Sequence, residues 1–120
     1  MKKIVFTGLS IFFLFTHCLV KAQKRSPVKD EIVVLFENDK MKVTKYVSNS
    51  GKDVCGKGTH KHPPHLDIAF TDITGIEIGK DGKPQKFTEK AGSVYWNEAV
   101  THIALNKGDK PAILYIVEPK

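Results

Sequence analysis

The chain has 120 residues, of which 19 are basic and 13 acidic, and its formal net charge is +6. A chain of this length forms one small domain with a single core. Its lysines are scattered among acidic and apolar residues, without a basic stripe or stacking aromatic residues. Nucleic-acid binding therefore has little support.

The first 22 residues are predicted to be a bacterial-type export signal. Lys2 and Lys3 form a positively charged start, residues 4–15 form an apolar segment, and Val20 and Ala22 are small residues suited to a cleavage site. The apolar segment is shorter than the roughly 20 residues that a membrane span needs. We therefore expect removal of residues 1–22.

Cleavage after Ala22 is favoured over acylation of Cys18, which would make a lipoprotein, because His17 stands where a small residue is expected. The mature chain would be residues 23–120, a single domain with no stable membrane span. Three lysines leave with the signal, so 16 basic and 13 acidic residues remain and the net charge falls to +3. We expect the protein in the periplasm or outside the cell.

Short apolar or alternating runs recur along the mature chain, and none keeps a helical period. About nine strands at this spacing indicate an all-β antiparallel sandwich or barrel. The aromatic residues expected in its core are Phe36, Phe70, Phe87 and Tyr115. The runs are EIVVLFE (31–37), MKVTKYV (41–47), GTHKH (58–62), LDIAFTD (66–72), ITGIEIG (73–79), QKFTE (85–89), SVYWN (93–97), VTHIAL (100–105) and AILYIVE (112–118).

Histidines gather in the stretch GTHKHPPHLD, residues 58–67. His60 and His62 lie two residues apart on a predicted strand, so their side chains point to the same face, with Cα atoms roughly 6.5 Å apart. His102, in another alternating strand, could supply a third imidazole from across a barrel. Three such nitrogens suit a catalytic or binding metal ion with open positions. The alternative is a polar loop, with His102 as a half-buried core residue.

Cys55 is the only cysteine of the predicted mature chain, so a disulfide within one chain is excluded. A buried, inert thiol is the favoured interpretation. Pairing between chains is a second possibility. A third is that Gly56 and Gly58 fold Cys55 back toward the histidines, where its thiolate would be a strong ligand.

Both histidine segments together resemble the two motifs of a small single-domain cupin. The first family motif carries His-x-His across a hairpin, which His60 and His62 match. The second has a glycine, a histidine about ten residues later and an asparagine four beyond, which Gly92, His102 and Asn106 match. The resemblance spans roughly residues 31–118. It implies a double-stranded β-helix, a jelly-roll barrel, with a metal in its mouth.

One position departs from the family pattern. Leu66 stands where the family has a metal-binding glutamate, and its neighbours His65 and Asp67 are the nearest replacements. Period-2 alternation would point Leu66 into the barrel and both neighbours out, unless a bulge intervenes. His65 is the preferred optional fourth ligand, so the expected metal ligands are His60, His62, His102 and His65.

The ligand set leaves the metal and the reaction open. Three histidines favour zinc, nickel or copper, whereas an added ligand from His65 or Asp67 brings iron or manganese back. The barrel could be a metal-dependent enzyme, a periplasmic module that binds a metal or a small molecule, or a structural barrel with a vestigial site. Glu98 is either an acid near the mouth or a solvent-facing carboxylate. Pairing through exposed sheet edges, which the resemblance also implies, suggests a homodimer.

Overall fold

A computed structural model describes residues 28–120 as an all-β protein. The predicted signal, residues 1–22, lies outside the described residues. Within the described part, no helix is long and apolar enough to cross a membrane. The strands are β1 (Glu31–Glu37), β2 (Met41–Ser48), β3 (His60–His62), β4 (His65–Ala69), β5 (Ile73–Gly79), β6 (Pro84–Glu89), β7 (Val94–Asn97), β8 (Val100–Asn106) and β9 (Ala112–Pro119).

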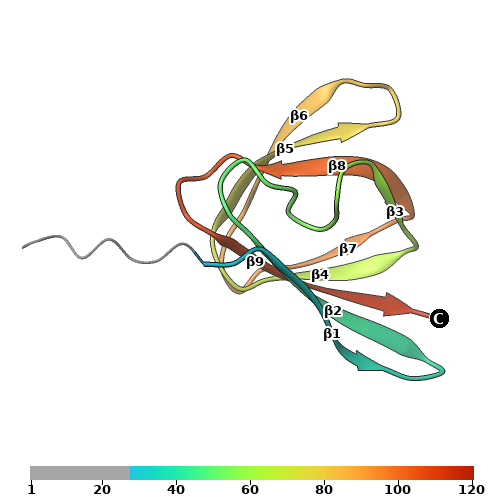
Figure 1. Cartoon of the computed structure of the whole chain (residues 1–120). Helices are drawn as coiled ribbons and strands as arrows, with labels where there is room; N and C mark the ends of the chain where they lie inside the picture. Colours follow the sequence, from blue (N-terminus) through green and yellow to red (C-terminus); the bar gives the residue numbers. More distant parts are fainter. Residues whose placement is uncertain (1–27) are drawn as a thin grey trace, which may run out of the picture.

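Two antiparallel sheets form the barrel. One has the strand order β1-β2-β9-β4-β7 and the other has the order β3-β8-β5-β6. Each sheet pairs strands that are distant in the chain, β2 with β9 in one and β3 with β8 in the other, and the hairpin of β1 and β2 extends beyond the rest of the barrel (Figure 1). The predicted all-β antiparallel jelly roll is confirmed.

The core lies between the sheets and is built from the inward residues of each strand. Ile73 and Ile116 are each 1% exposed, and truncating such a residue to alanine costs about 2–5 kcal/mol. Phe87 packs against this core from β6. It does so because Gly75 has no side chain: a Cβ there would lie 2.3 Å from the Phe87 ring.

The inward face of β4 is the reverse of the predicted one. His65, Asp67 and Ala69 are buried, whereas Leu66 and Ile68 are only partly buried on the outer face. The pairing of β4 with β7 and β9 has no bulge. The predicted alternation of side chains along this strand is confirmed. The prediction that its apolar side faces the core is wrong.

The predicted aromatic core is also largely wrong. Phe36 is 50% exposed and Phe70 is 53% exposed. Tyr115 lies on the outer face of β9, where its ring stacks on that of Phe70 with centroids 4.1 Å apart. Only Phe87 contacts the core as expected. Apolar side chains therefore cover both faces of the five-stranded sheet.

The loop between β2 and β3 runs beside β8 like a short additional strand. Val54 N–H donates to the Ala104 carbonyl at 2.6 Å, and Asn106 N–H donates to the Lys52 carbonyl at 2.8 Å. These bonds hold the loop against the barrel, so Cys55, the next residue, is fixed and buried at 5% exposure.

Candidate metal centre

Four side chains gather between the two sheets, from the 49–59 loop and from β3 and β8. They are Cys55, His60, His62 and His102, and one donor atom from each lies within 4.8 Å of all the others. His60 pairs directly with His102, because β3 and β8 are neighbours in one sheet. The third histidine therefore comes from the adjacent strand rather than from across the barrel.

Cys55 Sγ lies between two of the imidazoles. It is 3.4 Å from His60 Nε2 and 3.5 Å from His102 Nε2. The His60 ring packs against Gly56, where a Cβ would lie only 2.3 Å from His60 Nδ1. The glycine that follows the cysteine thus allows the thiol and the imidazole to approach each other. This agrees with the third interpretation of Cys55, in which the glycines fold it toward the histidines.

Acidic side chains orient two of the three imidazoles. Nδ1 of His62 lies 3.1 Å from Glu118 Oε1, and Nδ1 of His102 lies 2.8 Å from Glu77 Oε1. A ring that donates from Nδ1 to a carboxylate keeps the lone pair of Nε2 free. Histidines that ligate metals carry the same arrangement.

His60 is oriented mainly by the backbone. Its Nδ1 lies 2.7 Å from the Gly58 carbonyl oxygen, with Asp53 Oδ2 at 3.5 Å. All three imidazoles therefore have an oxygen acceptor at Nδ1. The sequence did not predict the two glutamates that orient these rings, because Glu77 lies 25 residues from His102 and Glu118 lies 56 residues from His62 in the chain.

The donor set fits a transition-metal ion. Bond lengths of about 2.3 Å to sulfur and 2.0–2.1 Å to nitrogen in a tetrahedron separate the two donors by about 3.6 Å. The measured sulfur–nitrogen separations of 3.4 and 3.5 Å agree with this value. His62 Nε2 is buried and has no hydrogen-bond partner, which is costly unless another group binds it.

Burial keeps two of these donors in their neutral forms. It raises the pKa of the Cys55 thiol well above its usual value, and negative charges on Asp53 and Asp67 act in the same direction. Burial also lowers the pKa of His62. A bound divalent ion reverses this preference at the sulfur, because a coordinated thiol is deprotonated.

His65, the expected optional fourth ligand, lies beside this group and is not among its four donors. Its Nδ1 is 2.7 Å from the Pro63 carbonyl oxygen, and its Nε2 is 3.4 Å from Asp67 Oδ1. Its Nδ1 is therefore engaged by the backbone, whereas its Nε2 faces Asp67 Oδ1 without a hydrogen bond. Cys55 supplies the fourth donor instead.

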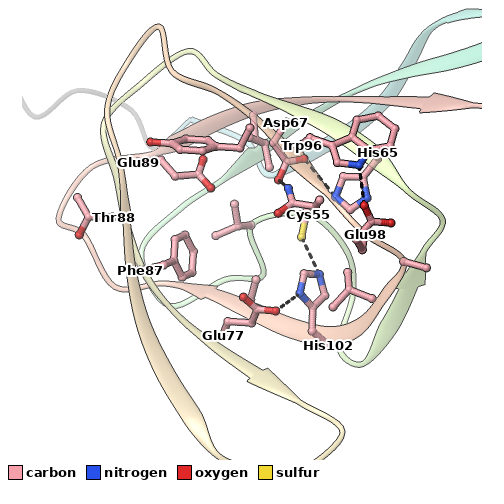
Figure 2. A pocket seen from close by; sticks show the side chains of 17 residues that line it. Cys55, His65, Asp67, Glu77, Phe87, Thr88, Glu89, Trp96, Glu98 and His102 are labelled. Atoms are coloured by element: carbon pink, nitrogen blue, oxygen red, sulfur yellow. Dashed lines mark hydrogen bonds and ion pairs between the residues drawn. The ribbon is translucent and has the colours of Figure 1, made fainter.

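A cavity of about 510 Å³ adjoins the cluster, and Cys55 and His102 form part of its wall. Figure 2 shows these two side chains pointing toward each other, with Glu77 hydrogen-bonded to the far side of the imidazole. Glu98, which the sequence left undecided, lines the cavity but is exposed and accepts a hydrogen bond from Trp96.

The sequence matches none of the family models and none of the curated proteins, but solved structures share its architecture. A cupin domain from Bordetella pertussis Tohama I superposes with a TM-score of 0.68 at 22% identity, covering 76% of this chain and 93% of that one. The chain has the cupin fold.

Two further solved structures are similar at lower TM-scores. An RmlC-like cupin family protein from Methanocaldococcus jannaschii has a TM-score of 0.61 at 14% identity, covering 80% of this chain and 84% of its own. The polyketide cyclase RemF from Streptomyces resistomycificus has a TM-score of 0.54 at 14% identity, covering 73% and 63%. Such identities establish the double-stranded β-helix of this cupin barrel and leave its chemistry to its own residues.

Replacing Glu118 with glutamine is expected to weaken zinc binding roughly tenfold, because His62 Nδ1 loses its charged acceptor. Hydrogen bonds from Lys42 and His62 lower the pKa of Glu118 although burial acts to raise it, so the carboxylate is charged at neutral pH. Competition titration against a chromogenic chelator measures the change. Glu37→Gln, at an exposed glutamate paired with Lys120, is the matched control, and equal affinities in both variants would contradict the role of Glu118.

Replacing Glu89 with glutamine is expected to stabilise the metal-free protein above neutral pH. Burial, assisted by the charges of Asp67 and Glu77, raises the pKa of Glu89 from 4.5 to about 7. The native state therefore binds more protons than the unfolded state, and stability falls as the pH rises from about 4.5 to about 7. Allowing for the partial exposure of Glu89, the cost above that range is about 1–2 kcal/mol.

Urea unfolding at about pH 5 and about pH 8 tests this prediction. The gain in unfolding free energy of Glu89→Gln over the parent should be larger at the higher pH. Glu98→Gln, at the exposed glutamate, should behave like the parent at both. An equal effect of Glu89→Gln at both pH values would show that the Glu89 charge is not the cause.

Proposed function

We propose that this chain is an exported barrel that holds one transition-metal ion through Cys55, His60, His62 and His102. The observation that carries the proposal is the convergence of one sulfur and three oriented imidazoles within 4.8 Å of one another, with two sulfur–nitrogen separations of 3.4 and 3.5 Å. A thiolate with three imidazoles is a softer set than three imidazoles with a carboxylate. It favours zinc or copper over iron and manganese.

The number of protein donors favours metal holding over catalysis. Structural zinc sites use four protein ligands, whereas catalytic sites keep a position open for water or substrate. Four donors already meet at this centre. The cluster is also well enclosed, because His62 and His102 are 5% and 8% exposed and Cys55 is 5% exposed.

Metal-dependent chemistry on a small molecule is the second candidate function. The cavity of about 510 Å³ that shares Cys55 and His102 with the cluster favours it, and RemF, named as a polyketide cyclase, is an enzyme on this fold. A bound zinc ion supplies Lewis acidity there. His65 and Asp67 line the same cavity and could hold or move a proton close to the cluster.

Elemental mass spectrometry of the purified mature chain tests the metal proposal. We expect about one zinc or copper ion per chain in the parent and in His65→Ala, and none in His60→Ala/His102→Ala. His65→Ala is the matched control because it removes a buried histidine beside the cluster without touching a donor. A parent that takes up no metal, even when incubated with each candidate ion, would overturn the proposal.

Export is proposed from the sequence of residues 1–22 alone. Amino-terminal sequencing of protein recovered from the periplasm or medium of a bacterial host should start at Gln23. A product that keeps residues 1–22 in the cytoplasm would contradict export. A lipid-modified chain starting at Cys18 would replace simple cleavage with anchoring.

A further inference from the structure

The cavity beside the metal cluster is lined by acidic side chains from three strands. They are Asp67 on β4, Glu77 on β5 and Glu89 on β6. Figure 2 shows all three around the cavity, together with Phe87. Of the described residues that line it, none is a lysine or an arginine. The cavity therefore concentrates acidic groups without a lysine or arginine to balance the charge of their ionised forms.

Two carboxylate oxygens in this lining are buried without a hydrogen-bond partner. Asp67 is 8% exposed, and its Oδ1 is one of them. The other oxygen of that side chain accepts a bond from Asn97 at 2.8 Å, and His65 Nε2 lies 3.4 Å from Oδ1. Glu89 Oε2 is the second unpartnered oxygen. Such oxygens are costly to bury unless a donor reaches them.

A metal ion in the adjoining cluster does not remove this charge. The Cys55 thiolate offsets one of the two positive charges of a divalent ion, which leaves one against the carboxylates. Glu77 is already hydrogen-bonded to His102, so Asp67 and Glu89 face the cavity as the free acceptors. The half-buried ring of Phe87 and the ring of Tyr95 add aromatic surface to the wall, and such rings attract organic cations.

We propose that this cavity binds a small organic cation with N–H donors, a primary ammonium or a guanidinium group attached to an apolar body. The charged group donates to Asp67 and Glu89, and the apolar body packs on Phe87. A cavity of about 510 Å³ is in the range of small-molecule sites. The proposal rests on the proposed function, because the metal cluster forms one wall of the cavity.

Benzylamine is the probe, and calorimetry at neutral pH on zinc-loaded mature protein is the measurement. It carries its proton at this pH, as a lysine side chain does, so its nitrogen has no lone pair for the metal. Benzyl alcohol and benzoate are the neutral and anionic matched ligands. We expect saturable binding of benzylamine, with binding of the other two weaker by about tenfold or more.

Glu89→Gln separates charge recognition from general binding to an apolar cavity. The substitution should weaken benzylamine binding about tenfold and leave benzyl alcohol unaffected, while the zinc content stays at that of the parent. Unchanged zinc content with equal binding of all three ligands would overturn the cation proposal and leave the metal proposal intact. A second divalent ion bound by Asp67 and Glu89, displaced by neither amine nor alcohol, would also overturn it. Loss of zinc from the parent would count against the metal proposal itself.

Discussion

Replacing Cys55 with serine is expected to lower the affinity for zinc by about 100-fold or more. Oriented neighbours of metal ligands are each worth about 10–100-fold, and a ligand itself contributes at least as much. A serine hydroxyl is a harder donor and keeps its proton at neutral pH, so it cannot replace a thiolate. Competition with a chelator of known affinity measures the loss.

Cobalt substitution identifies the sulfur ligand directly. The parent loaded with cobalt should show thiolate-to-metal charge-transfer absorption in the near ultraviolet, and Cys55→Ser should not. Val54→Ala is the control for packing damage, because Val54 is 3% exposed and adjacent in the chain but offers no donor. It should lose stability and retain the absorption. A cobalt-loaded parent without this absorption would return Cys55 to the role of an inert core thiol.

The strands and the second cupin motif are the parts of this molecule that the sequence predicted well. His60, His62 and His102 are brought together as expected, because the spacing of two residues and the family motifs encode local direction and register. Pairing across the chain is not encoded locally. The sequence therefore could not predict that His102 lies on the strand next to β3, which only the structure shows.

The wrong predictions have one cause, which is the apolar outer face. Leu66 and Phe70 form the more apolar side of the strand predicted over residues 66–72, and apolar sides usually face the core. In this barrel that side belongs to the uncovered face, so His65 and Asp67 turn inward.

Cys55 shows a different limit of sequence reasoning. The glycines at positions 56 and 58 indicated that the thiol could approach the histidines. The favoured prediction was nevertheless a buried, inert thiol, because most buried cysteines have no chemical role. What decides its placement is backbone pairing of the preceding loop with β8, an interaction between residues about 50 positions apart. In an exported protein, ligation would also protect this single thiol from oxidation.

Removing the metal is expected to lower the melting temperature by roughly 15 °C or more. A ligand present at 1,000 times its dissociation constant stabilises the native state by about 4 kcal/mol. Each kcal/mol shifts the midpoint of a domain of this size by about 4–8 °C. The metal-free state also leaves His62 Nε2 buried without a partner. Calorimetric scans with zinc and with chelator measure the difference.

The size of this shift should grow with pH. Because burial raises the pKa of the Cys55 thiol, the metal-free protein holds that proton, and zinc must displace it on binding. Affinity therefore rises as the pH increases from about 6 to about 8, and proton release appears as a dependence of the binding enthalpy on the buffer. His60→Ala/His102→Ala should show neither effect. A parent whose melting temperature is the same with zinc and with chelator would contradict a metal-holding centre. A shift independent of pH would argue against the thiolate as its fourth ligand.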